Sequence, residues 1–136
     1  MKQIVSGMVV ACLLVAVIVG CRSGGQLYQV KDAPVQTATG KEPNLEEVQK
    51  AIIQAGAALG WTMALVKPGE IMGTLNVRSH QAVVSIPYTS KSYSILYKDS
   101  NNLKYDAEKQ TIHENYTGWI QRLDGAIKSR LTAAGS

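Results

Sequence analysis

The chain contains no phenylalanine and only two cysteines, Cys12 and Cys21, both within its first 21 residues. Without phenylalanine, the large aromatic side chains available to fill a core are those of two tryptophans and six tyrosines. Because the chain after Cys21 has no thiol, it can form no disulfide even in an oxidising compartment. The fold must therefore be held together by its hydrophobic core alone.

The sequence also lacks the residue clusters that mark most catalytic, metal and nucleic-acid sites. The 14 lysines and arginines exceed the 10 acidic residues only slightly and form no basic run, so no nucleic-acid contact is expected. His80 and His113 stand far apart, without cysteine or carboxylate at ligand spacing. Ser79 and His80, with Asp99 some distance further along the chain, suggest a serine nucleophile, but the sequence lacks the strained elbow and oxyanion loop of such a site. We expect no metal, cofactor or catalytic residue, and interpret both histidines as solvated or helix-capping.

A hydrophobic run opens the chain. Lys2 precedes apolar residues from Ile4 to Gly20, and Cys21 follows at once. The run lies at the lower limit of the roughly 20 residues that span a bilayer, so an uncleaved transmembrane anchor is the alternative interpretation. A cysteine directly after a small residue indicates instead that residues 1–20 form a cleavable secretion signal.

The residues at this junction are Ile18-Val19-Gly20-Cys21, which resemble the lipobox of bacterial lipoproteins. The resemblance implies that the Cys21 thiol receives a diacylglyceryl group, that a peptidase cleaves before Cys21, and that the new amino terminus is acylated. Two or more acyl chains anchor a protein stably, whereas one gives marginal binding. Arg22 stands where aspartate commonly causes inner-membrane retention, so the resemblance implies a palmitate-bearing outer-membrane lipoprotein that faces the periplasm.

Residues 22–43 are rich in glycine, proline, serine, threonine and glutamine, and their apolar residues are too sparse to form a buried face. We interpret residues 21–43 as the lipidated cysteine and a flexible tether, with an average end-to-end distance of about 26 Å. The alternative assigns Gln26–Val30 to a short strand, added to the sheet or to a partner. A single domain is expected over residues 44–136.

The first part of this domain has the pattern of an amphipathic helix. Asn44 and Glu47 have the spacing of a capping box. Gly60 is suited to end the helix in a left-handed conformation. Apolar side chains recur every three or four residues at Leu45, Val48, Ile52, Ala55 and Leu59. The pattern predicts a helix with one buried face.

Alternating apolar and polar residues predict four strands, at Trp61–Val66, Ile71–Arg78, Ala82–Tyr88 and Ser92–Asp99. Residues 67–70 (Lys-Pro-Gly-Glu) suit a type II turn between the first two strands. Connections this short allow only antiparallel neighbours, so the strands should form a meander. Pro87 indicates an edge or a strand terminus. An exposed edge at Trp61 or near Pro87 can pair with another chain, which leaves a dimer open.

A second helix closes the chain. Thr111 and Glu114 have the spacing of another capping box. An apolar stripe follows at Ile112, Tyr116, Ile120, Leu123, Ile127 and Leu131. Gly118 and Gly125 each weaken this helix by about 1 kcal/mol relative to alanine and can let it lie close to the sheet. The whole pattern predicts an α+β fold, a two-layer sandwich of helix, four-stranded antiparallel meander and C-terminal helix.

Tyrosine is concentrated between residues 88 and 105, together with three lysines. Because tyrosine supplies large contact area at low entropic cost, such a surface can dock a protein, a glycan strand or lipid head groups. The residues of this candidate interaction surface are Tyr88, Tyr93, Tyr97, Lys98 and Tyr105. The competing interpretation, which we favour, makes Tyr93, Tyr97 and Tyr116 core rings that replace the missing phenylalanine.

The stretch SYSILYKDSNNLKYD, followed by IHENYTGWIQRL, is similar to a pattern of small uncharacterised proteobacterial lipoproteins. A Tyr-x-Ile-x-Tyr strand, an Asp-Ser turn and an Ile-His…Tyr…Trp-Ile helix characterise that pattern. The similarity covers roughly residues 61–123. It implies the same cell-envelope location, with no assigned activity and no catalytic residue.

The expected function is that of a non-enzymatic, lipid-anchored outer-membrane lipoprotein. Its small domain would bind another envelope component, with a protein as the leading candidate. This binding would support the assembly or integrity of the envelope. Two alternatives remain open. One is a periplasmic ligand-binding module, in which a helix on a curved sheet leaves a pocket between Trp61 and Trp119. The other is an enzyme that acts on cell-wall material.

Overall fold

A computed structural model describes residues 24–134 of the chain, so Cys21 and the expected signal segment 1–20 lie outside the described residues. In chain order, the elements of the described part are β1 (Gly25–Gln26), β2 (Val30–Pro34), α1 (Leu45–Ala58), β3 (Thr62–Lys67), β4 (Glu70–Val77), β5 (His80–Pro87), β6 (Ser92–Asn101), β7 (Thr111–Ile112) and α2 (Glu114–Ala134). Neither α1 nor α2 is both long and apolar enough to cross a membrane.

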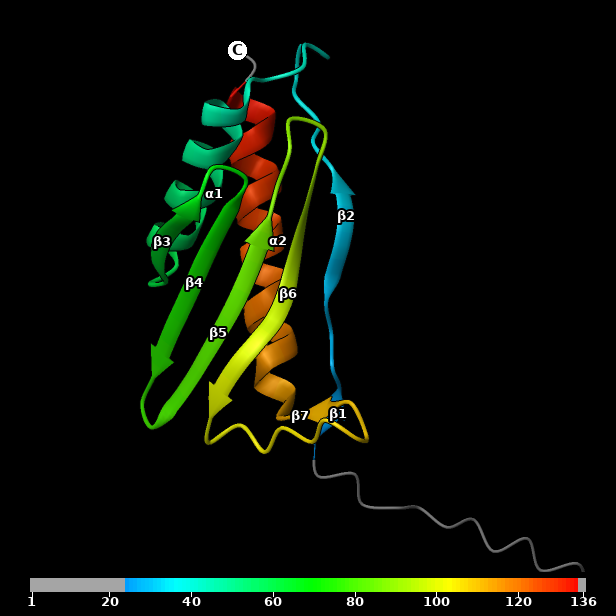
Figure 1. Cartoon of the computed structure of the whole chain (residues 1–136), viewed down its shortest axis with the longest axis vertical. Helices are drawn as coiled ribbons and strands as arrows, with labels where there is room; N and C mark the ends of the chain where they lie inside the picture. Colours follow the sequence, from blue (N-terminus) through cyan, green and yellow to red (C-terminus); the bar gives the residue numbers. More distant parts are fainter. Residues whose placement is uncertain (1–23, 135–136) are drawn as a thin grey trace, which may run out of the picture.

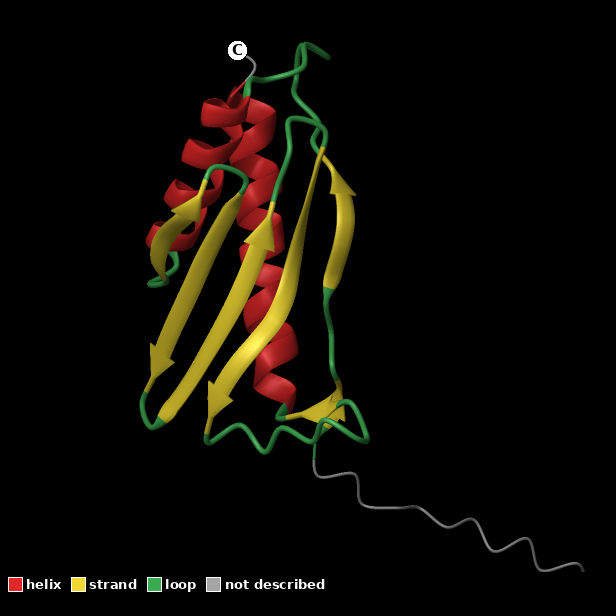
Figure 2. Cartoon of the chain, in the orientation of Figure 1, coloured by secondary structure: helices red, strands yellow, loops and turns green. Residues whose placement is uncertain are grey.

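Five strands form one antiparallel sheet in the order β2-β6-β5-β4-β3, and β1 pairs separately with β7. Both helices lie on the same face of the sheet (Figures 1 and 2). The predicted α+β class, the meander of β3 to β6 and the two helices behind it are therefore confirmed. We call the end with the β4–β5 turn, the end of β6 and the start of α2 the lower end, and the opposite end the upper end.

Helix α1 begins at the predicted capping box. The Asn44 Oδ1 accepts a hydrogen bond from the Glu47 N–H at 2.9 Å, and the Glu47 carboxylate accepts one from the Asn44 N–H at 3.3 Å. The middle of the apolar stripe is buried, but Leu45 and Leu59 are 37% and 41% exposed. These two residues lie at the two ends of the helix, so the prediction that they are buried was wrong.

The β3–β4 hairpin has the predicted turn, with Gly69 at a φ of 91° and Lys67 paired with Glu70. Strand β3 is an edge of the sheet, and its Leu65 and Val66 are 46% and 53% exposed. Pro87 ends β5, which has β4 on one side and β6 on the other. The expected edge near Trp61 is confirmed. Of the two expectations for Pro87, the strand terminus is confirmed and the edge was wrong.

The segment predicted as a flexible tether forms part of the fold. Strand β2 pairs with β6 through Val30 opposite Ile95 and Ala33 opposite Tyr93, and both Val30 and Ala33 are buried. These apolar residues lie three apart, which does not fit the regular alternation of a strand. A register shift between them, with Asp32 at a φ of 50°, brings both to the core side. The tether interpretation was therefore wrong here, and the alternative of an added strand is confirmed with shifted bounds.

The start of α2 also differs from the prediction. The backbone groups of Thr111 exchange hydrogen bonds with those of Asp106, and Thr111 lies in β7 instead of capping the helix. Helix α2 begins at Glu114. The expected capping box was wrong because the backbone of Thr111 is already committed to a strand. His113, the residue before the helix, takes the capping role.

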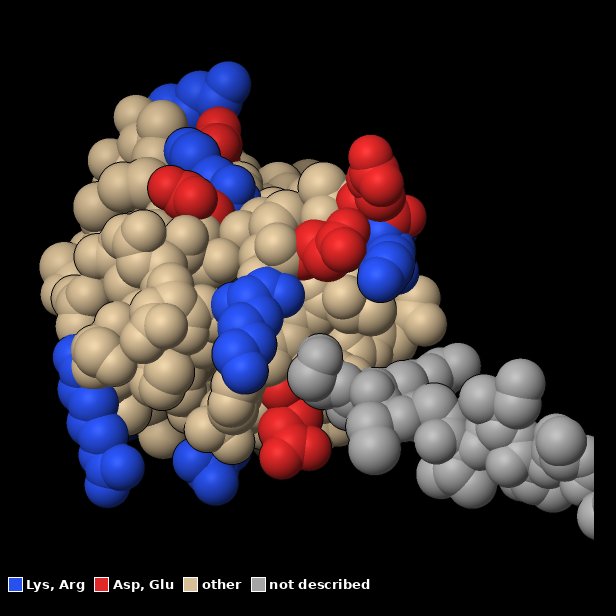
Figure 3. Space-filling view, turned by 90° about the horizontal axis from the view of Figure 1, so that it is seen from below, with Lys and Arg blue, Asp and Glu red and all other residues tan. Residues whose placement is uncertain are grey.

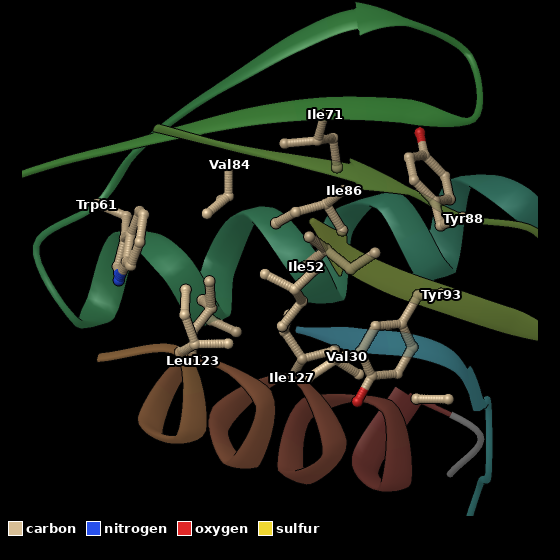
Figure 4. Close-up of a cluster of buried hydrophobic side chains, with 14 of the residues drawn as sticks. Val30, Ile52, Trp61, Ile71, Val84, Ile86, Tyr88, Tyr93, Leu123 and Ile127 are labelled. Atoms are coloured by element: carbon tan, nitrogen blue, oxygen red, sulfur yellow. The ribbon is translucent and has the colours of Figure 1, made fainter. Parts of the chain in front are cut away.

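The close approach expected at the glycines of α2 occurs elsewhere. Nothing lies within 4 Å of a side chain built at Gly118 or Gly125, so that expectation was wrong. Instead, the Met63 side chain lies against Gly56 of α1, and Trp61 and Val84 border Gly73 of β4. Figure 4 shows Trp61, Val84 and Leu123 in this packed layer between the sheet and the helices.

Candidate functional site

The five residues of the predicted tyrosine surface do not form one surface. Tyr88 and Tyr93 are only 4% and 1% exposed and point into the layer between sheet and helices (Figure 4). The rings of Tyr97 and Tyr105 stack at 4.1 Å between centroids, and Tyr97 meets buried Tyr116 edge-on. The core-ring interpretation is confirmed for Tyr93 and Tyr116. Tyr93 of β6 and Tyr116 of α2 are both buried in the core, which removes them from any docking face.

Lys98 is the one member of that set that is exposed. Val83 pairs with Asp99 and Val84 with Tyr97, so Lys98 is the extra residue at a register shift in β6. A bulge of this kind re-aims a side chain relative to its neighbours. Lys98 therefore lies away from the tyrosine rings with which the sequence grouped it.

Tyr93 belongs to a buried polar group that the sequence did not reveal. Its hydroxyl donates to the Asp124 Oδ1 of α2 at 2.5 Å, and the Lys128 Nζ lies 2.8 Å from the Asp124 Oδ2. Burial first, and then the bond to Asp124 and its negative charge, raise the pKa of Tyr93 far above the ordinary value. This group ties β6 to α2, with Tyr93 and Asp124 buried and Lys128 at the surface.

Tyr116 is the second buried ring with a shifted acidity. Its hydroxyl is buried without a hydrogen-bond partner among the described residues. Burial, and to a smaller extent the neighbouring Tyr97 and Tyr105, raise the pKa of Tyr116. Both tyrosines thus favour the neutral phenol in the folded state.

These shifts predict a loss of stability in alkali. The unfolded phenol ionises near pH 10.0, whereas the folded pKa of Tyr93 and of Tyr116 is higher. Their contribution to stability is fully present below pH 10 and is lost as the pH rises above it, because only the unfolded state then releases the protons. Urea unfolding at a series of pH values, with phenolate absorbance followed in parallel, measures this. Ionisation of all six tyrosines before any unfolding would contradict it.

A pocket of about 600 Å³ lies at the lower end, between the β4–β5 turn and the first turns of α2. We call it the arginine pocket. The lining residues used below are Arg78, His80, Glu114, Gly118, Trp119 and Arg122. The site therefore draws on two segments that are far apart in sequence.

The two histidines of the chain meet beside this pocket. Their ring centroids lie 5.7 Å apart, and the His80 centroid lies 6.4 Å from that of Trp119. The His80 Nδ1 lies 2.7 Å from the Asn102 carbonyl oxygen and therefore donates to it, so neutral His80 has a free lone pair at Nε2. The His113 Nδ1 accepts from the Asn115 N–H at 3.2 Å, so neutral His113 carries its proton at Nε2.

These contacts settle the earlier interpretations of the histidines. His113 caps α2, as predicted. His80 does not cap a helix. It is partly exposed beside the pocket, and its Nδ1 is bonded to a backbone carbonyl. The predicted meander could have shown that His80 and His113 lie at the same end of the sheet. Because β4 and β6 run in the same direction, the turn before His80 and the start of α2 must share one end of the sheet.

The described residues around this pocket are not arranged for metal ligation or for a serine nucleophile. Residues 24–134 contain no group of three histidine, cysteine, aspartate or glutamate side chains that could hold a metal. A proton at the His113 Nε2 also prevents that nitrogen from acting as a ligand while His113 caps the helix. The Ser79 Oγ accepts a hydrogen bond from Asn102, and an Asp99 oxygen accepts from the Ser100 N–H. The serine arrangement considered from the sequence is thus not assembled.

Two arginines supply the positive charge of the pocket. Within residues 24–134, neither Arg78 nor Arg122 forms an ion pair or a hydrogen bond through its side chain. Arg78 also has a φ of 54° in the two-residue turn between Val77 and His80, a position that commonly carries glycine, asparagine or aspartate. Figure 3, which views the lower end, shows basic and acidic side chains interspersed, without a broad patch of one sign. The pocket is therefore a local cationic site and not part of a broad charged face.

Comparisons with protein-family models, curated proteins and solved structures found no significant match. The class that the geometry defines is a two-layer α+β domain with an open pocket at one end.

Proposed function

We propose that the protein is a lipid-anchored, non-catalytic outer-membrane lipoprotein that binds another envelope component at its lower end. The observation that supports this most directly is the place of Gly24. A side chain built at Gly24 would lie 2.9 Å from the Ile112 carbonyl oxygen and 3.9 Å from the His113 nitrogen. The described chain therefore begins beside the start of α2, at the same end as the arginine pocket.

The short distance in sequence between Cys21 and Gly24 makes the anchor tight. Three residues span at most about 10 Å, in contrast to the long tether expected from composition. Lipid on Cys21 would hold the lower end next to the membrane surface. The upper end, with the β3–β4 and β5–β6 turns, would face the periplasm (Figure 1).

Binding at the surface suits this molecule better than binding in its interior. The space beside Trp61, which the ligand-binding alternative requires to be open, is occupied by Met63 and Val84. Trp119, in contrast, lines the open pocket. The pocket offers two arginines and an indole, and arginine and tryptophan are enriched at recognition surfaces.

The test combines labelling with site-specific crosslinking in cells. Wild-type protein should incorporate radiolabelled palmitate and fractionate with the outer membrane, and Cys21→Ala should lose both properties. A photo-crosslinking residue at Asn115, at the lower end, should then give discrete adducts in the wild type and weaker ones in Cys21→Ala. The same residue at Ser90, at the upper end, is the control and should give few adducts.

Two results would overturn the proposal. Unlabelled wild-type protein would remove the anchor. Equal adducts at Asn115 and Ser90 in labelled protein would remove the lower end as the contact surface.

A further inference from the structure

The arginine pocket has the chemistry of an oxyanion site. Arg78 and Arg122 come from opposite walls, the β4–β5 turn and the third turn of α2. A planar guanidinium matches phosphate and carboxylate oxygens with paired N–H donors. Their lack of side-chain partners within residues 24–134 leaves both forks available to a ligand. The positive end of the α2 dipole adds to the same preference.

His80 and Trp119 complete one wall of the pocket. Since the His80 Nδ1 is held by the Asn102 carbonyl, the Nε2 is the ring nitrogen left to bind a ligand, by accepting when neutral or donating when protonated. Trp119 is half-buried and presents an aromatic surface. Tryptophan is enriched where proteins meet the interfacial region of a membrane, because its ring is apolar and its N–H is polar.

Glu114 limits which oxyanion fits. Its carboxylate lines the same pocket and has no side-chain partner within residues 24–134. A bare anion would be repelled by this charge, whereas a ligand that carries a phosphate and a nearby hydrogen-bond donor would satisfy both signs. An ammonium group would also gain attraction from the indole face of Trp119.

We propose that the arginine pocket binds the phosphate head group of a membrane lipid, with the phosphate between Arg78 and Arg122 and a donor group, such as the ammonium of ethanolamine, at Glu114. This rests on the proposed function, because an anchor at Cys21 brings the lower end within about 10 Å of such head groups. A volume of about 600 Å³ is in the range of small-molecule sites. The acyl chains on Cys21 would fix the domain at the membrane, and the pocket would fix its orientation.

The test uses the full chain, purified from membranes in a maltoside detergent that carries no phosphate. Glycerophosphoethanolamine is titrated as the soluble head group, and inorganic phosphate is titrated in parallel. Binding is followed by tryptophan fluorescence, because Trp119 lines the pocket while Trp61, the only other tryptophan, is buried. We expect saturable binding of the head group and weaker binding of phosphate alone.

Matched variants locate the site. Arg78→Gln and Arg122→Gln should each weaken head-group binding about 10- to 100-fold, the range for hydrogen bonds to charged groups. Arg130→Gln removes a cation from the same helix outside the pocket and should have no effect. Glu114→Gln should reduce the preference for the head group over inorganic phosphate.

A steric variant tests the pocket without removing charge. Gly118→Leu places a side chain where nothing lies within 4 Å, so it should plug the pocket and weaken binding at least about tenfold while the helix gains a better helix former. Gly125→Leu makes the same change at an equally open position two turns further along α2 and should bind normally.

Four results would overturn the proposal. The first three are no saturable binding by the wild type, unchanged binding in both arginine variants, and equal loss in Gly118→Leu and Gly125→Leu. The fourth is that inorganic phosphate binds while glycerophosphoethanolamine does not. The last would assign the site to free phosphate. Each is distinguishable from failure of the proposed function, because palmitate labelling and the Asn115 adducts can persist without any lipid head-group site.

Discussion

Replacing Tyr93 by phenylalanine is expected to lower the free energy of unfolding by about 2 kcal/mol, which corresponds to a fall in Tm of about 10 °C. The phenol of Tyr93 donates to Asp124, whose residue exposure is only 8%. Without that donor the carboxylate keeps Lys128, but the Lys128 side chain is 56% exposed and its pairing is weakened by solvent. The loss therefore comes from a buried charge that is left partly unsatisfied.

Tyr116→Phe is the matched control for this result. It removes the same hydroxyl from an equally buried ring, but the Tyr116 hydroxyl has no partner among residues 24–134. Its removal should leave stability unchanged or raise it by up to about 1 kcal/mol, because a desolvated hydroxyl without a partner is unfavourable. Urea unfolding followed by circular dichroism measures both variants. Equal losses would show that the Asp124 bond contributes nothing specific.

Replacing Val30 by aspartate is expected to destabilise the domain by about 3 kcal/mol, because it buries an unpaired charge beside β6. Val30 is 8% exposed and pairs with Ile95. The adjacent Lys31 is exposed, so Lys31→Asp should change stability by less than about 0.5 kcal/mol. Thermal unfolding of both variants makes the comparison.

This pair of variants decides whether residues 30–34 act as sheet or as tether. A tether contributes nothing to folding, so a Val30→Asp protein as stable as the wild type would support the interpretation from composition. A large loss in Val30→Asp beside a neutral Lys31→Asp would place the start of the folded domain well before Asn44. The length of free chain behind the proposed anchor depends on that outcome.

Local patterns predicted the elements that are stabilised by neighbours in sequence. The capping box of Asn44 and Glu47, the turn at Gly69 and the alternation along β4 and β5 each involve residues a few positions apart. Their physical causes are backbone hydrogen bonding and glycine's freedom at positive φ, which operate without the rest of the fold. These elements, and the antiparallel order that their short connections impose, were therefore recovered from the sequence.

Predictions failed where a distant strand or a bulge changed the environment. Val30 and Ala33 are buried only because β6 lies beside them and a register shift changes their phase. Thr111 looked like a helix cap, but its backbone pairs with Asp106. Lys98 does not lie with the tyrosines because of a bulge in β6. None of these causes produces a recognisable spacing of apolar and polar residues in the segment that it affects.

The sequence by itself determined the α+β class, the order of helix, meander and helix, and the resemblance of Cys21 to a lipidation site, since each depends on short spacings along the chain. Only the tertiary structure decided that β2 belongs to the sheet, that Tyr93 is bonded to Asp124, and that Arg78, His80 and Arg122 meet in one pocket. The reason is that antiparallel strands and a returning helix bring distant residues to one end of the domain, and that closeness is a property of the packed layers.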